Sequence, residues 1–434
     1  MERIIAHSDL NCFYASVEML RNPRLRDVPF AVCGSKEKRH GIVLTANYPA
    51  KGRGVKTGMA NWQACQVCPG LYTVPPRIQD YIQFSGFVRD LYSTYTDRVE
   101  PFGLDEAWLD LTGCVPSFNA GVQAIAELKE KIKRELGLTV SIGLADNKVF
   151  AKLGSDMKKP DAYTVIPRAD FREIVWPLPV GDLLYVGRAT QAKFLSKNIR
   201  TIGDLAQTDE KHLKRWLGKV GLVLHAFANG EDRSAVAPTG YEAPIKSVGN
   251  STTCPRDLKT DQDVKIILFA LAESVSARMM ELGLAAQTIE FSFVNGDITY
   301  CGSRQCKIPF PTNISKEIAD IAFQLFKKCH GHWPYPLRKI GVRGCDLVSQ
   351  NAPRQLTFDM DIDYLENAEE LERNVNMLRQ RYGNKIIQRA IMLVDPHLSS
   401  LDAKKDHTVH PVGVFTGSGG VSVQWGGYTT QIIA

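Results

Sequence analysis

The sequence predicts a multidomain α+β protein. It is 434 residues long, its first third alternates strand-like and helix-like segments, and residues 246–349 have the pattern of a separate βαββαβ unit. With 44% hydrophobic residues, the chain can build several packed cores. The formal net charge of +6 is a mild basic bias, which is compatible with a polyanionic partner.

Residues 1–168 are expected to form a mixed sheet covered by helices. Apolar residues at helical spacing, strand-like apolar runs and the stop signals Gly137 and Pro160 define the elements. The predicted order is a strand, a helix, an α-rich insert, and then helix, strand, helix, strand and helix. The segments that carry this order are 3–7, 13–20, 21–74, 79–95, 103–111, 125–136, 138–144 and 147–158.

The rest of the chain divides by composition. Short helices with glycines are predicted over residues 169–231, and the Pro- and Gly-containing stretch 233–244 is expected to be a linker. The βαββαβ unit has a hairpin signal at Asn295-Gly296 and two predicted helices, at 261–282 and 315–328. Its last strand is predicted at 339–342, and beyond it the sequence predicts one helix over 368–381 and a loose Gly/Ser-rich tail from residue 402.

Several protein classes are excluded by the sequence. The N-terminus has no signal-peptide core, and no apolar run approaches the ~20 residues that cross a bilayer. The ten cysteines show no disulfide framework, and the one CxxC, Cys65 with Cys68, has no second ligand pair for zinc. We therefore expect a soluble, cytoplasmic protein with reduced, structural cysteines.

Asp105 and Glu106 lie side by side in the apolar stretch "GLDEAWLDL". A buried carboxylate is costly unless it is paired or binds a metal. The two side chains would point to opposite faces of a regular strand, so they can serve one site only at a strand end or an irregular turn, which Gly103 could provide. Asp9 ends the first strand and is the candidate third carboxylate of a divalent-metal site. The alternative is that Asp105 and Glu106 are solvated on an edge strand.

Two basic stretches are candidate phosphate sites. In "GIVLTANYPAKGRGVKTGM", residues 41–59, the side chains of Thr45, Tyr48 and Lys51 could face a phosphate, although a solvated loop explains the same composition. In "NKVFAKLGSDMKKPD", Lys159 follows a predicted helix, where the helix dipole alone favours a cation.

Four motifs occur in a fixed order: "SDLNCFYASVE", "TANYPAKGRGVKTGM", "GLDEAWLDL" and "NKVFAKLGSDMKKPD". Together they resemble the motifs of the Y-family translesion DNA polymerases, specifically the bacterial UmuC-like and polymerase IV-like members, and the resemblance runs from Ile4 to about Ala390. It implies a right-hand polymerase with a ferredoxin-like palm, small fingers, a helical thumb and a βαββαβ little finger. The implied domains are palm 1–20 and 75–168, fingers 21–74, thumb with a helix-hairpin-helix 169–232, linker 233–244, little finger 245–350 and C-terminal extension 351–434.

The resemblance assigns roles to residues of the active site. It implies that the carboxylates of Asp9, Asp105 and Glu106, with the Leu10 carbonyl, hold two Mg²⁺ ions for in-line phosphoryl transfer. The implied nucleotide-binding residues are Phe13, the steric gate Tyr14, Thr45, Tyr48, Lys51 and Lys159. Two positions depart from the family pattern: Lys51 puts a point charge where a bidentate arginine is more usual, and a glycine at position 103 replaces a common serine.

The resemblance also implies DNA contacts outside the active site. Val186 and Gly187 belong to a hairpin that binds phosphate through backbone N–H groups, with Tyr185 in place of its usual first glycine. In the last little-finger strand, Lys339 and Arg343 share the face opposite the apolar one and suit a DNA backbone. A solvated strand face is the alternative for these two residues.

The segment "RQLTFDMD" lies where such polymerases carry a sliding-clamp peptide. Gln355, Leu356 and Phe358 fit the peptide in part, but Asp359 replaces its second bulky residue, and a linker with chance hydrophobic residues is the alternative. The partners that the resemblance implies are primer–template DNA, deoxynucleoside triphosphates and, through this segment, a sliding clamp. It implies no membrane partner, a monomer, and a location at the nucleoid.

The function that the resemblance implies is error-prone, template-directed DNA synthesis past lesions. Two other classes remain open at this point. A nucleotidyl cyclase also uses paired acids on a palm-like sheet, but it needs no thumb or little finger to hold a duplex. A non-catalytic DNA- or clamp-binding relative has no need of the three intact acids.

Overall fold

The computed structural model describes residues 2–35, 41–241, 244–330, 336–353, 362–399 and 401. They form two compact units, the first built from residues up to 33 and from 42 to 241, and the second mainly from residues beyond Pro244. In this described part of the chain, none of the helices is long and apolar enough to cross a membrane.

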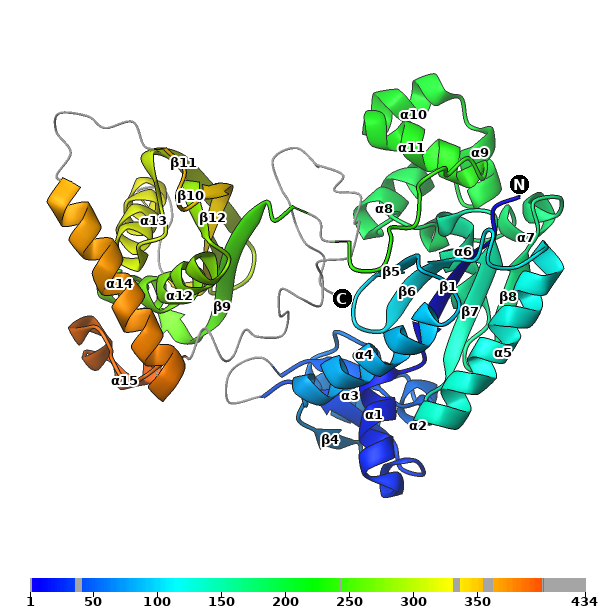
Figure 1. Ribbon diagram of the computed structural model, residues 1–434, viewed down its shortest axis with the longest axis horizontal. Helices are drawn as coiled ribbons and strands as arrows, with labels where there is room; N and C mark the ends of the chain where they lie inside the picture. The colour runs from blue at the N-terminus through cyan, green and yellow to red at the C-terminus, as the bar shows by residue number, and fades with distance from the viewer. Residues whose placement is uncertain are drawn as a thin grey trace. The chain divides into compact units, whose positions relative to one another are not determined.

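The first unit is built on a five-stranded sheet of order β5-β6-β1-β7-β8 (Figure 1). Strand β1 is central and pairs antiparallel with both β6 and β7, whereas β7 and β8 are parallel. The strands are β1 (Ile5–Leu10), β5 (Val99–Pro101), β6 (Glu106–Asp110), β7 (Val140–Ala145) and β8 (Tyr163–Ile166). The predicted mixed sheet is therefore confirmed.

Helices cover both faces of this sheet. Side chains alternate along β1, so Ala6 and Leu10 enter a core with α1 (Phe13–Arg21), α4 (Ile78–Ser93) and α5 (Phe118–Leu136), whereas Ile5 enters a core with α6 (Lys148–Met157). Gly137 caps α5 with φ 67°, which confirms the predicted helix end.

Strand β7 and helix α6 approach each other through two glycines. A methyl group on Gly143 would overlap the Ala151 carbonyl oxygen, and a methyl group on Gly154 would lie 3.1 Å from the Gly143 Cα. The backbones of strand and helix are therefore in direct contact, with no side chain between them.

The insert between α1 and α4 contains a second sheet, so the prediction that it is α-rich was wrong. Its strands have the order β3-β2-β4 and comprise β2 (Phe30–Cys33), β3 (Val43–Ala46) and β4 (Tyr72–Val74). Strands of three or four residues are too short to show a period of two in the sequence. The other elements here are η1 (Pro23–Leu25), α2 (Tyr48–Gly52) and α3 (Asn61–Val67).

Short helices follow the first sheet, as the sequence predicted. They are α7 (Phe171–Val175), η2 (Val180–Asp182), α8 (Arg188–Ser196), α9 (Ile202–Gln207), α10 (Glu210–Leu217) and α11 (Lys219–Ala228). Tyr185, in the turn before α8, has a left-handed φ of 69°. A glycine would adopt this conformation at no steric cost, so the tyrosine keeps the turn at some cost in strain.

The stretch 233–244 was predicted as a linker, but its residues Ala237 and Thr239 are bound to the first unit. The Ala237 N–H donates to the Glu100 carboxylate at 2.9 Å, and the Thr239 N–H donates to the Asp97 carbonyl at 2.8 Å. The composition of the stretch gave no sign of these two contacts.

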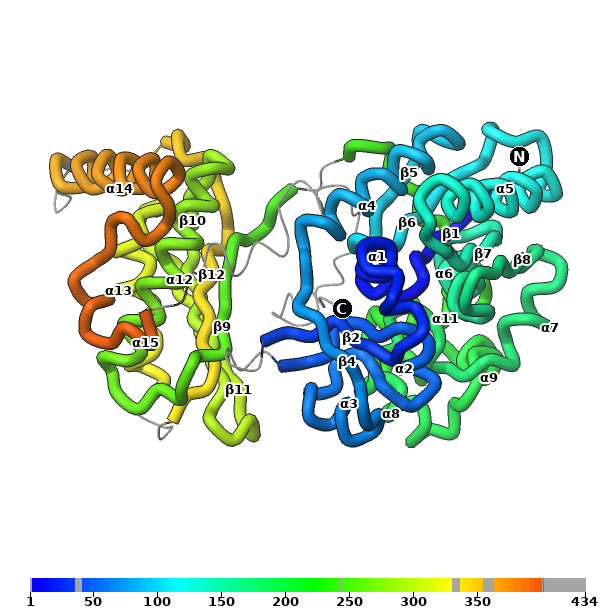
Figure 2. The backbone as a smooth tube through the Cα atoms, turned by 90° about the horizontal axis from the view of Figure 1, so that it is seen from below, coloured from blue at the N-terminus to red at the C-terminus, as the bar shows by residue number. Residues whose placement is uncertain are grey.

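The second unit is the predicted βαββαβ arrangement, and Figure 2 shows α12 and α13 together on one side of its strands. The sheet has the order β11-β10-β12-β9, and the elements are β9 (Ser247–Leu258), α12 (Asp261–Glu281), β10 (Leu284–Asn295), β11 (Cys301–Thr312), α13 (Ser315–His330) and β12 (Leu337–Ser349). In β12, Ile340 and Val342 are buried while Lys339 is exposed and Arg343 half-buried, which confirms the predicted alternation.

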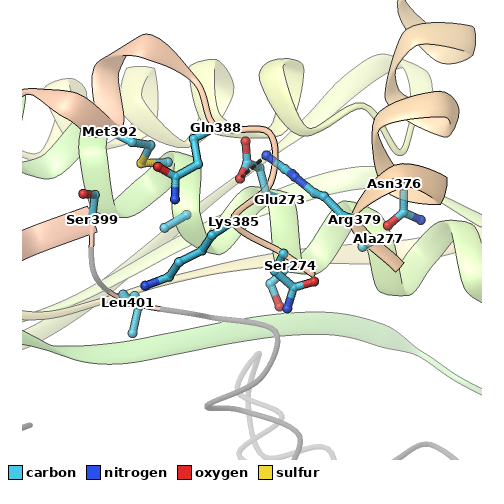
Figure 3. Close-up of a pocket in the computed structure, with 12 residues that line it drawn as sticks. Glu273, Ser274, Ala277, Asn376, Arg379, Lys385, Gln388, Met392, Ser399 and Leu401 are labelled. Atoms are coloured by element: carbon cyan, nitrogen blue, oxygen red, sulfur yellow. Dashed lines mark ion pairs between the residues drawn. The ribbon is translucent and has the colours of Figure 1, made fainter. Parts of the chain in front are cut away.

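A C-terminal extension packs on α12. It consists of α14 (Ile362–Tyr382), η3 (Ala390–Leu393) and α15 (Pro396–Ser399), so the predicted helix 368–381 begins earlier than expected. Arg379 and Arg389 both pair with Glu273 of α12, and the Arg379 side chain reaches Glu273 at the edge of a pocket (Figure 3). The segment "RQLTFDMD" and the tail from residue 402 lie outside the described residues.

Candidate active site

The irregular turn that the sequence predicted before the acidic pair is confirmed. Strand β6 begins only at Glu106, and Gly103 has φ 94°, a conformation that favours glycine. Helix α4 holds the turn, because Ser85 Oγ donates to the Leu104 carbonyl at 2.5 Å and Arg89 donates to the Gly103 carbonyl at 3.0 Å. Asp105 therefore precedes the regular strand and need not point away from Glu106.

Strand pairing brings the third acid beside this pair. Asp9 of β1 is directly opposite Glu106 of β6 in the antiparallel register. The next residue, Leu10, donates its N–H to the Asp105 carbonyl at 2.9 Å. The three carboxylates thus gather at one end of β1 and β6, although Asp9 is far from Asp105 and Glu106 in the sequence.

Two lysines lie against these carboxylates. Lys159 Nζ is 2.7 Å from Asp9 Oδ2 and 2.8 Å from Asp156 Oδ1, and Lys152 Nζ is 2.6 Å from Glu106 Oε2. Within the described residues, no three His, Cys, Asp or Glu side chains form a ready-made metal-binding group. The acids are therefore close together, but two of them are turned toward ammonium groups.

The acids repel one another electrostatically. Burial, together with the charges of Glu106 and Asp9, raises the pKa of Asp105 to about 7. Burial and the Glu106 charge also raise the pKa of Asp9, against the opposing effect of Lys159. Burial lowers the pKa of Lys159, but Asp9 and Asp156 outweigh it and the net shift is upward.

This donor set fits a divalent cation in its chemistry. Carboxylate oxygens are the ligands that hard divalent cations prefer. A cation at this end of the sheet would relieve the repulsion that raises the pKa of Asp105 and Asp9. The ammonium groups of Lys159 and Lys152 already pair with Asp9 and Glu106. These two carboxylates would therefore have to rotate before they could bind a cation.

Tyr14 lies beside the acids in a stack of aromatic rings. Its ring stacks on Tyr81 with centroids 4.2 Å apart and contacts Phe13 at 5.6 Å. The Tyr81 hydroxyl donates to the buried Glu18 at 2.7 Å, which fixes the ring on which Tyr14 rests. Burial and the nearby Asp105 raise the pKa of Tyr14 to about 12, so its hydroxyl stays neutral.

Two of the residues of the insert that are predicted to bind the triphosphate, Tyr48 and Lys51, lie on a short helix that Asn47 caps. Its buried side chain caps helix α2, where Oδ1 accepts the Ala50 N–H at 3.1 Å. Helix α2 carries Tyr48 and Lys51, whose ammonium group lies 5.3 Å from the centre of the Tyr48 ring. Thr45 is on the adjoining strand β3.

The predicted DNA contacts have unequal support in the geometry. Val186 is buried and its N–H already donates to the Leu183 carbonyl at 3.0 Å, so a phosphate would have to compete for that donor. Gly187 is the N-cap residue of α8, next to the free N–H groups of a helix start. The clamp residues Gln355, Leu356 and Phe358 lie outside the part of the chain that the structure describes.

Sequence reasoning missed residues that surround the acids. His7 and Ser155 are buried behind them, and Lys152 was read only as part of a motif. His7 could have been found, because it precedes Asp9 by two residues and therefore shares its strand face. Ser155 and Lys152 gave no signal, because their positions depend on how α6 packs on the sheet.

Family models match three stretches of the chain. The impB/mucB/samB family matches residues 8–156, and the C-terminal domain of that family matches residues 245–358. A model described as the thumb domain of DNA polymerase-iota matches residues 181–232. These stretches together span more than half of the chain.

Whole-chain relatives agree with the family models. The chain is 47% identical over 401 residues to a DNA polymerase IV of Acetivibrio thermocellus, covering 92% of this chain and 100% of the relative. It is 38% identical over 395 residues to DNA polymerase IV 1 of Bacillus subtilis, covering 90% and 93%. A solved Y-family DNA polymerase chimera matches the fold with a TM-score of 0.72 at 24% identity, over 80% of this chain and 99% of the other.

The palm-like sheet, the short helices and the βαββαβ unit together define a right-hand polymerase, as the sequence predicted. The chain belongs to the Y-family translesion DNA polymerases, the impB/mucB/samB family. It is a DNA-directed DNA polymerase that carries out translesion synthesis. The two alternatives, a nucleotidyl cyclase and a non-catalytic relative, do not agree with these comparisons.

Proposed function

We propose that Asp9, Asp105 and Glu106, with the Leu10 carbonyl, hold two Mg²⁺ ions during addition of deoxynucleotides to a primer 3′ end. The observation that carries this proposal is the gathering of three mutually repelling carboxylates at one end of β1 and β6. Bound magnesium supplies charge stabilisation at the phosphates and lowers the pKa of the attacking hydroxyl.

The cationic and aromatic side chains around the acids orient the nucleotide. Thr45, Tyr48 and Lys51 bind the triphosphate from the insert, and Lys159 binds it from the palm. Lys159 Nζ is 2.7 Å from Asp9 Oδ2, so binding of a phosphate oxygen by Lys159 exchanges a carboxylate partner for a phosphate partner. This exchange would leave an oxygen of Asp9 free to hold a cation.

Tyr14 selects the sugar, with Phe13 packed beside it. The ring of Tyr14 is held from below by Tyr81, so it cannot give way to a ribose 2′-hydroxyl without breaking the stack. Rejection of ribonucleotides then follows from steric contact.

Contacts farther from the chemistry hold the DNA and the clamp. The duplex backbone is held by Val186 and Gly187 in the thumb and by Lys339 and Arg343 in the little finger, without reading base sequence. A sliding clamp is bound by Gln355, Leu356 and Phe358. The protein acts as a monomer at the nucleoid.

The test of the metal assignment is the Asp105→Ala variant. We expect it to lose nucleotide incorporation by orders of magnitude in a primer-extension assay on a lesion-containing template, because one metal carboxylate is gone. Its affinity for primer–template DNA, measured by fluorescence anisotropy, should change little, because the proposed DNA contacts lie elsewhere. Steady extension by this variant, freed of contaminating polymerase, would remove Asp105 from the site.

A further inference from the structure

A buried histidine lies directly behind the acidic cluster. His7 is 0% exposed and shares a face of β1 with Asp9, while its cross-strand partner on β6 is Trp108, two residues beyond Glu106. Its ring contacts Trp108 edge-on, with centroids 5.1 Å apart. The imidazole therefore packs against Trp108 of β6 and faces the helix that covers this side of the sheet, α6.

The two ring nitrogens of His7 have different surroundings. Nδ1 is 2.8 Å from Ser155 Oγ on α6, which is a hydrogen bond. Nε2 is 3.3 Å from Glu106 Oε2 and has no aligned hydrogen-bond partner, although it is fully buried. Buried polar atoms without a partner are rare, and this one is aimed at a carboxylate of the active site.

The tautomer of His7 is coupled to the direction in which the Ser155 hydroxyl donates. This hydroxyl has one hydrogen and two acceptors in reach, Nδ1 of His7 and the Lys152 carbonyl, whose oxygen is 2.7 Å away. If that hydrogen goes to Lys152, Nδ1 must donate and Nε2 turns a lone pair toward Glu106, which is repulsive. If it goes to Nδ1, the neutral ring presents Nε2–H to Glu106, which is attractive.

The same oxygen of Glu106 is also held by Lys152. Lys152 Nζ is 2.6 Å from Oε2, and Lys152 and Ser155 lie one turn apart on α6. Helix α6 thus acts on Oε2 of Glu106 twice, directly through Lys152 and indirectly through Ser155 and His7. Neither of these contacts uses the other oxygen, Oε1.

We propose that His7 is a positioning residue for Glu106, oriented by Ser155: its Nε2–H would donate to Oε2, and Oε1 would then be free to hold a divalent cation. A small rotation converts the present 3.3 Å contact into an aligned hydrogen bond. The bond restricts Glu106 to one rotamer and leaves one oxygen for the cation. This inference rests on the proposed role of Glu106 as a metal-binding residue.

The experiment measures cation binding apart from turnover. Full-length protein with primer–template DNA is titrated with Mn²⁺, and free Mn²⁺ is followed by electron paramagnetic resonance. For Ser155→Ala and His7→Phe we expect the Mn²⁺ midpoint to rise about tenfold, as is usual when a partner that orients a metal-binding side chain is removed. His7→Gln, which keeps an N–H donor, should recover part of the loss. DNA affinity should stay within about twofold in all three.

Ser196→Ala is the matched control, because the Ser196 hydroxyl, like that of Ser155, has a carbonyl oxygen three residues earlier within reach, that of Lys193, at 2.7 Å, but it does not contact the acidic cluster. It should leave the Mn²⁺ midpoint unchanged. A purely structural role for His7 would lower thermal stability and leave the midpoint where it is in both Ser155→Ala and His7→Phe, and that result overturns the inference. If His7→Phe does not fold, Ser155→Ala decides alone. Asp105→Ala separates the two levels: tight Mn²⁺ binding by that variant contradicts the metal site itself.

Discussion

Replacing Asn47 by alanine should both loosen the first unit and weaken nucleotide binding. The side chain is 1% exposed, and it makes four hydrogen bonds. Oδ1 accepts the N–H groups of Phe30 and Ala50 at 3.1 Å each, and Nδ2 donates to the Val28 carbonyl at 2.8 Å and the Leu25 carbonyl at 3.4 Å.

The size of the effect follows from these bonds. Loss of the N-cap of α2 costs about 1 kcal/mol of unfolding free energy, and leaving the buried Phe30 N–H without a partner costs about 1–3 kcal/mol more. We therefore expect a loss of about 3 kcal/mol. For a unit of this size that corresponds to a fall of about 6–12 °C in the unfolding midpoint.

Differential scanning calorimetry and single-nucleotide incorporation give the two measurements. Because α2 carries Tyr48 and Lys51, the KM for the incoming nucleotide should rise more than kcat falls. Asn22→Ala is the control, since Asn22 caps η1 at the surface with one bond of 3.3 Å, and it should lower the midpoint by no more than a few degrees. If Asn47→Ala melts within about 2 °C of the unaltered protein, the buried network does not stabilise the insert in the way argued above.

Three further predictions concern the sugar, the cation and the clamp. Tyr14→Ala should raise ribonucleotide incorporation sharply, and unchanged discrimination between ribo- and deoxyribonucleotides would exclude Tyr14 as the gate. Because the pKa of Asp105 is raised to about 7, its contribution to the stability of metal-free protein is present at acidic pH and lost as the pH rises through about 7. Stabilisation by Mg²⁺ should have the opposite pH dependence, because protons compete with the cation for the carboxylate. The Mg²⁺-induced rise in melting temperature should therefore be larger at pH 8 than at pH 6, and Asp105→Asn should reduce this difference. An equal rise at both pH values would contradict this reasoning. Leu356→Ala with Phe358→Ala should leave single-nucleotide insertion intact but shorten products when a clamp is loaded, and equal product lengths would show that the segment is only a linker.

The sequence predicted the parts of the fold that depend on local pattern. Helix α5 ends at Gly137 as expected, and the alternation argument placed an irregular turn at Gly103, because two adjacent carboxylates cannot share a face of a regular strand. Residues 21–74 were misjudged, since β4 has only three residues, of which Tyr72 and Thr73 are exposed and carry no strand pattern. Tertiary pairing, not local propensity, makes such short strands.

The residues of the candidate site that belong to sequence motifs could be predicted. The contacts that depend on how helices pack on the sheet could not. The gathering of Asp9 with Glu106 follows from adjacent strands, which sequence order suggested. The pairing of Lys152 with Glu106 joins residues 46 apart and depends on how α6 lies on the sheet. The hydrogen bonds that Ala237 and Thr239 make to the first unit were missed for the same reason, because backbone hydrogen bonds leave no mark in composition.

Because Gly143 of β7 and Gly154 of α6 are in direct contact, no side chain between this strand and this helix can adjust its conformation to absorb a change. Any side chain at position 143 must displace the whole of α6, because the atoms that it would overlap belong to the backbone of that helix and cannot rotate away. Lys152 and Ser155 would move with the helix, and the contacts that Lys152 makes with Glu106 and Ser155 makes with His7 would be lost. A substitution at position 143, which contacts no nucleotide, no DNA and no cation, would then behave as an active-site mutation.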